Sequence, residues 1–342
     1  MKFVRFILFP FSIIYHAITA IRNFLFDVEI FKQTGFKVPI IIVGNLSVGG
    51  TGKTPQIEYL IRLLKDSFKV AVLSRGYKRK TDGYILLNEK HSALDVGDEP
   101  LQYFKKFNNI NVAVDANRVK GVNKLISQKS PEVILLDDAY QHRKIRGSFY
   151  ILLTKFDDLF IDDYLLPAGN LRESRNGASR TDVIVVTKCP SDLSIKSQQL
   201  IQKRLQKFNK QVYFSKISYG KIKSSKNQFS IDEISNYKVL LITGIANPKP
   251  LLSFLDKNQV SYKHFNYPDH HHFSAKELKA IMYKFDEIKS NKKILLTTEK
   301  DYIRLQGSLS NLYFIEIETS FLANGKDIFN NQITIHLNQY NY

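Results

Sequence analysis

The sequence has one cysteine, and its acidic residues are outnumbered by its basic ones. Cys189 is the single cysteine among 342 residues, which excludes an internal disulfide framework and zinc sites built on paired cysteines. A lone thiol is typical of a protein in a reducing compartment. The 50 lysines and arginines exceed the 32 aspartates and glutamates by a formal net charge of +18. This excess favours an anionic partner, which can be nucleic acid, a phosphorylated substrate or an acidic membrane surface.

Internal repeats and long low-complexity tracts are also absent from the sequence. Hydrophobic residues make up 44% of the chain and charged residues 24%, which is ordinary for a globular protein and excludes wholesale disorder. A chain of this length is too long for one compact core, so we expect two or three domains.

The longest uncharged stretch lies near the N-terminus, between Arg5 and Arg22. Its 16 residues include Pro10 and fall short of the about 20 that a helix needs to cross a bilayer. No small-residue cleavage site follows the stretch, as it would in a signal peptide. We therefore expect residues 1–27 to form a helix that lies in the membrane interface, with its arginines near lipid phosphates. A buried core helix is the alternative.

Short apolar runs rich in β-branched residues alternate with helical patterns along residues 28–217. This alternation predicts an α/β fold of the P-loop NTPase type, in which helices cover both faces of a doubly wound, mainly parallel sheet. The expected strands are residues 38–43, 70–73, 111–114, 133–136, 150–153 and 183–186.

A polar stretch divides this region from the rest of the chain. Residues 218–235 are crowded with lysine, serine and asparagine, which predicts an inter-domain linker. Residues 236–342 then open with an apolar run at 238–243 and contain further strand patterns. We expect them to form a second, smaller α/β domain.

The strongest chemical signal is a glycine-rich turn directly after the first expected strand. Glycines let successive backbone N–H groups converge on phosphate oxygens, and the helix N-terminus behind the turn favours negative charge. The strict phosphate-loop pattern is broken at one place, where Ser47 stands instead of the first glycine. We expect a nucleoside triphosphate to bind Ser47, Val48, Gly49, Gly50, Thr51, Gly52, Lys53 and Thr54.

Two carboxylates follow another expected strand, where a metal ligand is needed. In nucleotide-binding loops of this type the lysine, here Lys53, reaches the β- and γ-phosphates, and the hydroxyl of the next residue, here Thr54, binds Mg²⁺. Asp137 and Asp138 come after the run 133–136, so the carboxyl end of that strand would place them in the same crevice. Simple turn chemistry is the alternative for these two residues.

Seven short strings then occur in the order found in one enzyme family, the tetraacyldisaccharide 4′-kinases of lipid A biosynthesis. They are GGTGKTP at 49–55, LSRGY at 73–77, VGDEP at 96–100, LDDAYQH at 136–142, PAGNLRE at 167–173, YPDH at 267–270 and TEKD at 298–301. The sequence resembles that family over nearly its whole length. It departs from the family where Ala139 and Tyr140 replace Gly-Phe, and where Asn170 and Ser174 replace common prolines.

The resemblance implies an enzyme that transfers the γ-phosphoryl of ATP, with Mg²⁺, to the 4′-hydroxyl of an acylated glucosamine disaccharide 1-phosphate, giving lipid IVA. It implies a site at the cytoplasmic face of the inner membrane of a Gram-negative bacterium. We expect a monomer that binds the membrane surface and its glycolipid substrate, and no nucleic acid.

The resemblance also implies roles for two residues that the sequence places far apart. Asp98 is the candidate base, and His270 is its candidate partner from the second domain, so that domain closure would assemble the site. From the residues alone, Asp98 can equally be a helix N-cap, because Pro100 follows in the first turn. The three histidines at 270–272 can equally be exposed side chains, or less readily a metal site.

Further candidates come from the strings that surround these residues. Glu173 is predicted as an additional metal ligand. The role of the string at 298–301 stays open. Each cation among the substrate candidates can also be a solvated surface residue. The residues expected to bind substrate are Arg75, Gly76, Arg118, Gln141, His142 and Arg172.

Two other classes of protein compete with this interpretation. A membrane-recruited regulatory ATPase of the partitioning type also combines a similar loop with an amphipathic helix, but it carries a signature lysine where this chain has Val48. A nucleic-acid-binding NTPase would suit the net charge, but the sequence contains no compact basic-aromatic module.

Overall fold

The computed structural model describes residues 2–340, apart from the side chains of residues 2–4 and 6. Its strands are β1 (Ile40–Asn45), β2 (Val70–Ser74), β3 (Ile85–Leu86), β4 (Asn111–Val114), β5 (Val133–Asp137), β6 (Phe149–Lys155), β7 (Val183–Thr187), β8 (Gln211–Lys223), β9 (Gln228–Phe229), β10 (Lys238–Thr243), β11 (Ser261–Asn266), β12 (Lys293–Thr298) and β13 (Leu312–Phe321). Its α-helices are α1 (Lys2–Asp27), α2 (Lys53–Leu64), α3 (Ala93–Val96), α4 (Asp98–Lys106), α5 (Arg118–Lys129), α6 (Ile195–Leu205), α7 (Ile231–Ile234), α8 (Lys249–Lys257), α9 (Ala275–Asp286), α10 (Glu299–Leu305) and α11 (Gly325–Tyr340).

The first domain is built on parallel strands in the order β7-β6-β1-β5-β2-β4, with β3 antiparallel at the edge. These strands are apolar throughout because both faces of the sheet are covered. Helices α2 and α4 bury one face, and α5 contributes Val122 and Leu125 to the core on the other face. The mainly parallel α/β fold predicted from the sequence is therefore confirmed.

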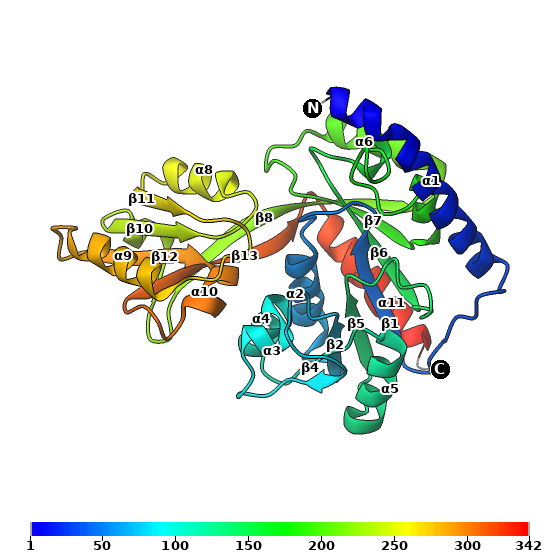
Figure 1. Ribbon diagram of the computed structural model, residues 1–342, viewed down its shortest axis with the longest axis horizontal. Coiled ribbons are helices and arrows are strands. Elements are labelled where there is room, and N and C mark those ends of the chain that lie inside the picture. The colour runs from blue at the N-terminus through cyan, green and yellow to red at the C-terminus, as the bar shows by residue number, and fades with distance from the viewer. Residues whose placement is uncertain (1, 341–342) are drawn as a thin grey trace.

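A long two-stranded ribbon joins the first domain to the second (Figure 1). Strand β8 begins parallel to β7, and beyond Phe214 it pairs antiparallel with β13. Strands β11-β10-β12-β13 continue from there as a parallel sheet, so one continuous sheet runs through both domains. The segment predicted as a linker, residues 218–235, holds the end of β8 together with β9 and α7.

The chain returns to the first domain at its C-terminal end. Residues Phe329, Ile333 and Leu337 of α11 are fully buried in the core that also contains Ile57 and Leu60 of α2. Their spacing of four residues puts them on one side of the helix, and that side packs on the first domain. From the sequence we expect the second domain to span residues 236–342. In the structure it ends before α11, because β13 carries the chain back along the ribbon to the first domain.

Helix α1 has its polar side toward the protein and its apolar side outward. The Ser12 hydroxyl donates to the Leu165 carbonyl at 3.0 Å, and the Tyr15 hydroxyl donates to the Arg172 carbonyl at 2.8 Å. Within residues 2–340, this is the one helix long and apolar enough to cross a membrane by length and composition. Its exposed large apolar residues are Ile7, Phe9, Phe11, Ile13, Ile14, Ile18, Ile21 and Phe24.

Candidate active site

The glycine-rich turn after β1 is held in the form of a phosphate loop. Gly49 and Gly52 have φ angles of 103° and 87°, which L side chains rarely adopt, so glycine is required at both places. The Thr187 hydroxyl donates to the Thr51 carbonyl at 2.7 Å, and the Lys188 ammonium donates to the Gly50 carbonyl at 2.7 Å. The end of β7 therefore fixes the shape of the turn before any nucleotide binds.

A second segment supports the other side of this turn. Ser47 is buried and forms an isolated antiparallel bridge with Leu171, and the Val48 N–H donates to the Asn170 carbonyl at 2.8 Å. The serine that replaces the first glycine of the pattern is thus accommodated by pairing with the loop 165–173.

Lys53 extends from the first turn of α2 toward the acidic pair at the end of β5. Its ammonium donates to Asn45 Oδ1 at 3.3 Å and lies 3.5 Å from Asp138 Oδ1. Arg172 contacts the same Asp138 carboxylate at 3.1 Å. Burial alone would raise the pKa of Asp138, but the charges of Lys53 and Arg172 outweigh burial and lower it.

Asp137 has few partners for a buried carboxylate. Its contacts are the Ser74 and Tyr103 hydroxyls, each at 3.4 Å. Burial and the charge of Asp138 raise the pKa of Asp137 to about 6. A buried carboxylate with spare lone pairs suits a hard cation such as Mg²⁺, which takes one or two carboxylates and completes its shell with phosphate and water. The Tyr103 hydroxyl, which contacts Asp137, also interacts with Thr54 at the start of α2.

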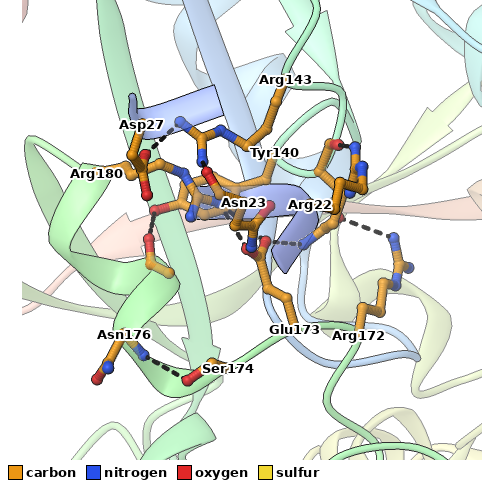
Figure 2. Close-up of polar contacts among 12 residues, drawn as sticks. Arg22, Asn23, Asp27, Tyr140, Arg143, Arg172, Glu173, Ser174, Asn176 and Arg180 are labelled. Carbon is orange, nitrogen blue, oxygen red and sulfur yellow. Dashed lines mark hydrogen bonds and ion pairs between the residues drawn. The ribbon is translucent and has the colours of Figure 1, made fainter. Parts of the chain in front are cut away.

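Glu173, the further metal ligand predicted from the sequence, is engaged by protein partners in this structure. Its oxygens accept hydrogen bonds from Arg180 at 2.9 and 3.0 Å, from Asn23 at 2.7 Å and from Gln141 at 3.1 Å (Figure 2). In the part of the chain whose side chains are described, no three His, Cys, Asp or Glu residues form a group that could hold a metal. The predicted ligand instead joins helix α1, through Asn23, to the loop behind the nucleotide site.

Asp98 and His270, 172 residues apart, meet between the two domains. His270 Nδ1 lies 2.9 Å from Asp98 Oδ2. Arg304 of α10 donates Nε to Asp98 Oδ1 at 2.7 Å and a terminal nitrogen to Oδ2. Burial raises the pKa of Asp98, but the hydrogen bonds from His270 and Arg304 outweigh it and lower that pKa to about 2.

The string at 298–301, whose role the sequence leaves open, carries this second-domain contribution. Thr298 caps α10 by accepting from the Asp301 N–H, and Asp301 accepts from the Gly244 N–H at 2.8 Å. Lys300 then lies beside the histidine, 3.0 Å from His270 Nε2 and 2.8 Å from Asp269 Oδ1. The string is therefore a helix start that places the Lys300 ammonium beside His270.

A buried ion cluster joins the two domains behind this pair. Lys106 of α4 lies 2.7 Å from Glu58 of α2 and 2.7 Å from Glu299 of α10, and all three side chains are nearly inaccessible to solvent. Burial and the charge of Glu58 raise the pKa of Glu299 to about 7. The Lys106 ammonium thus forms ion pairs with one carboxylate from each domain.

The predicted substrate residues fall into two groups. Arg118 is buried beside Asp137, its NH1 donates to the Asp115 and Ala116 carbonyls, and its Nε has no partner. Arg75 is exposed, and Gly76 beside it has φ of 71° with backbone too close for a Cβ. These residues line the edge of the site formed by β2, β4 and β5.

The second group follows β5 and faces α1. Gln141 donates to the Asn45 carbonyl at 2.8 Å. Burial, together with the charge of Arg118, lowers the pKa of His142 to about 4, and His142 Nε2 has no partner. His142 also lines a pocket of about 990 Å³, whose wall combines apolar and cationic side chains: Arg22, Phe26, Ile30, Phe31, Lys32, Thr34, Asn117, Val119, Lys120, Asn123, Lys124, Arg143 and Lys144.

Some residues of this site escape the sequence reasoning. Thr187 and Lys188 follow a predicted strand, and the rule that ligands gather at carboxyl ends of parallel strands could have selected them. Lys300 lies in a recognised string, but no local pattern predicts that its ammonium contacts His270 and Asp269. Arg304 lies outside the seven strings, so only the folded chain relates it to Asp98.

Comparisons with known proteins agree with this geometry. The model of the family described as tetraacyldisaccharide-1-P 4′-kinase matches residues 4–337. The tetraacyldisaccharide 4′-kinase of Flavobacterium johnsoniae is 51% identical, covering 94% of each chain, and that of Bacteroides thetaiotaomicron is 44% identical, covering 95% of this chain and 91% of its own. A crystal structure of LpxK from Aquifex aeolicus in complex with ATP is similar with a TM-score of 0.80 at 31% identity, covering 98% of this chain and 99% of that one.

Proposed function

Because this chain belongs to the tetraacyldisaccharide 4′-kinase family, we propose that it transfers the γ-phosphoryl of ATP to the 4′-hydroxyl of an acylated glucosamine disaccharide 1-phosphate. The product is lipid IVA. The observation that carries this proposal is the meeting of Asp98, beside the nucleotide site, with His270 from the other domain. A regulatory ATPase needs no such acceptor site, and the family match also favours the kinase.

The triphosphate lies along residues 47–54, with the backbone N–H groups of the turn directed at its oxygens. Lys53 neutralises the β- and γ-phosphates, and it must exchange its contact with Asp138 for one with phosphate. The Thr54 hydroxyl and Asp137 would hold Mg²⁺, which would supply charge neutralisation to the triphosphate. Arg118, with an unpartnered nitrogen facing this edge, binds a phosphate of the nucleotide or of the acceptor.

His270, and not Asp98 itself, takes the proton from the acceptor hydroxyl. Both oxygens of Asp98 are held by Arg304, and its pKa of about 2 makes it a weak base. His270 Nδ1 donates to this carboxylate, which leaves Nε2 as the acceptor. The hydroxyl oxygen attacks the γ-phosphorus in line, its proton passes to Nε2, and the bond to the β-γ bridging oxygen breaks to release ADP.

The glycolipid reaches this site along α1. The exposed apolar side of the helix enters the lipid interface at the cytoplasmic face of the inner membrane, and its polar side stays on the protein. The pocket beneath the end of α1 offers apolar walls and the cations Lys120, Lys124 and Lys144 to the sugar and its 1-phosphate. We propose that the protein acts as a monomer.

The direct test is an assay of purified protein in detergent with labelled ATP, Mg²⁺ and the acylated disaccharide 1-phosphate. We expect one labelled phosphate on the lipid, and a loss of at least 100-fold in kcat for Lys53→Ala and Asp98→Ala, since each removes charge placement at the reacting groups. Exposed Lys279→Ala is the matched control. Hydrolysis of ATP that is indifferent to the lipid, with no lipid product, would refute the proposal in favour of a regulatory ATPase.

A further inference from the structure

Lys300 has a fixed position that the reaction described above does not use. Thr298 and Asp301 lock the start of α10 onto the end of β10, through the Thr298 cap and the hydrogen bond from the Gly244 N–H. The ammonium of Lys300 is held between Asp269 Oδ1 at 2.8 Å and His270 Nε2 at 3.0 Å, and its side chain is 22% exposed. A lysine placed this firmly beside a candidate base is more than a solvated surface charge.

The hydrogen bonds around His270 determine which ring nitrogen carries its lone pair. His270 Nδ1 lies 2.9 Å from Asp98 Oδ2 and 3.0 Å from the terminal nitrogen of Arg304 that donates to the same oxygen. The carboxylate only accepts and Arg304 already donates to it, so Nδ1 donates its hydrogen to Asp98. An ammonium only donates, so Nε2 accepts from Lys300. Lys300 therefore occupies the place that the acceptor hydroxyl must take when it gives its proton to Nε2.

The contact with Nε2 also places Lys300 near the group that is transferred. A hydroxyl that gives its proton to Nε2 attacks the γ-phosphorus from that position, so the phosphoryl group comes within reach of an ammonium that lies 3.0 Å from Nε2. The charge of Lys300 acts on the nucleotide side as well, because Lys300 and Lys53 of the phosphate loop both oppose the rise that burial causes in the pKa of Glu99.

We propose that Lys300 is a further catalytic residue, delivered by the second domain, whose ammonium passes from His270 Nε2 to the transferring phosphoryl group when the acceptor hydroxyl arrives. This inference rests on the proposed kinase function. Before the acceptor binds, Lys300 donates a hydrogen bond to the lone pair of His270 Nε2. In the loaded site it stabilises the charge that builds up on the phosphoryl oxygens while the hydroxyl oxygen bonds to phosphorus and ADP leaves.

Steady-state kinetics of Lys300→Met, which keeps the length of the chain and removes its charge, test this role. We expect kcat to fall at least 10-fold, with the KM for ATP and for the lipid within 3-fold of wild type, because the contact forms in the transition state. Lys300→Arg, which keeps the cation, is expected to recover part of the loss, and exposed Lys279→Met is expected to match wild type. A fall in kcat below 10-fold, or a loss confined to KM, would overturn the proposal.

Activity of the wild-type protein distinguishes a failure of this inference from a failure of the proposed function on which it rests. If wild-type protein makes no lipid product, the kinase proposal itself fails. If wild type is active and Lys300→Met is equally active, only the role of Lys300 fails.

A chemical label tests the placement without relying on activity or on folding of a variant. An acyl-phosphate derivative of ATP carries a carbonyl at the γ-phosphate, a nearby lysine amine attacks that carbonyl, and ATP leaves as the amide forms. Peptide mapping of labelled wild-type protein is expected to find the acyl group on Lys53 and Lys300, but not on Lys279, with protection by excess ATP. A wild-type protein in which Lys300 stays unlabelled would show that its ammonium does not reach the γ-phosphate.

Discussion

Replacing Lys106 by methionine should destabilise the protein, and the loss should grow as the pH rises above 7. The substitution removes the cation that lies 2.7 Å from both Glu58 and Glu299 and leaves two buried carboxylates facing each other. A buried ion pair that loses one partner costs about 3–5 kcal/mol. The chain can limit that cost by protonating Glu299, whose pKa is already raised from 4.5 to about 7.

The cost of that proton depends on pH, and this dependence is the sharp part of the prediction. In the unfolded chain the carboxyl titrates near 4.5, so holding it protonated at pH 7 costs about 3.4 kcal/mol, at 1.36 kcal/mol per pH unit. Wild type carries nearly the same cost up to pH 7, because its own Glu299 has a pKa of about 7, and above that pH the wild-type carboxylate ionises and its cost levels off. The destabilisation by Lys106→Met relative to wild type should therefore grow by about 1 kcal/mol between pH 7 and pH 8.

Urea unfolding followed by circular dichroism at the two pH values measures this difference directly. Lys105→Met is the matched control, because Lys105 is the exposed neighbour on the same helix and should change stability by less than about 0.5 kcal/mol. Equal destabilisation by Lys106→Met at pH 7 and pH 8 would refute the electrostatic reasoning and leave packing as the cause.

Other predictions follow from single contacts. Lys188→Met removes the 2.7 Å hydrogen bond to the Gly50 carbonyl, so the KM for ATP should rise several-fold with kcat within 2-fold, whereas exposed Lys196→Met should match wild type in the same assay. Ile18 is 61% exposed on α1, and Ile18→Glu should weaken binding to anionic vesicles in sedimentation at least 10-fold, because burying an isoleucine contributes about 2 kcal/mol. Tyr283→Glu, at a similarly exposed side chain on the other domain, should leave vesicle binding unchanged. Equal losses of binding in the two variants would argue against α1 as the membrane contact. Because the pKa of Asp98 is lowered from 3.8 to about 2, its ion pair with Arg304 contributes fully to stability above about pH 4, and this contribution is lost as the pH falls toward 2. Arg304→Gln should therefore lower the free energy of unfolding, followed by circular dichroism, at pH 6 and hardly change it at pH 2. An identical loss of stability at both pH values would contradict this prediction.

The sequence predicts those parts of the structure that depend on local pattern. Strands such as β5 and β7 are recognisable because burial on both faces demands continuous apolar runs, and the phosphate loop because its glycines need positive φ. The return of α11 to the first domain is not predictable in this way. The apolar side of α11 predicts that the helix packs against a core. The domain to which that core belongs depends on the ribbon of β8 and β13, which brings the chain back to the first domain.

The same distinction applies to the candidate site. Asp98 and His270 are selected by strings that resemble a family, and the fold brings their side chains within 2.9 Å. Arg304 and Lys300 gain their meaning from residues about 200 and 30 positions away, and no spacing rule encodes such contacts. Glu173 lies in a recognised string, and its role as a metal ligand stays a prediction, but its partners Arg180 and Asn23 are contacts that the sequence alone does not reveal.

If α1 lies in the lipid interface as proposed, its contacts with the loop 165–173 would fix the height of the reacting groups above the lipid headgroups. Tyr15 and Asn23 bind that loop from one side and the Val48 backbone binds it from the other, so the loop links the helix to the phosphate loop. With the helix seated in the interface as proposed, the enzyme would meet its acceptor by diffusion in two dimensions. Turnover would then follow the mole fraction of acceptor in the surface and fall when inert detergent dilutes that surface, even at constant bulk concentration.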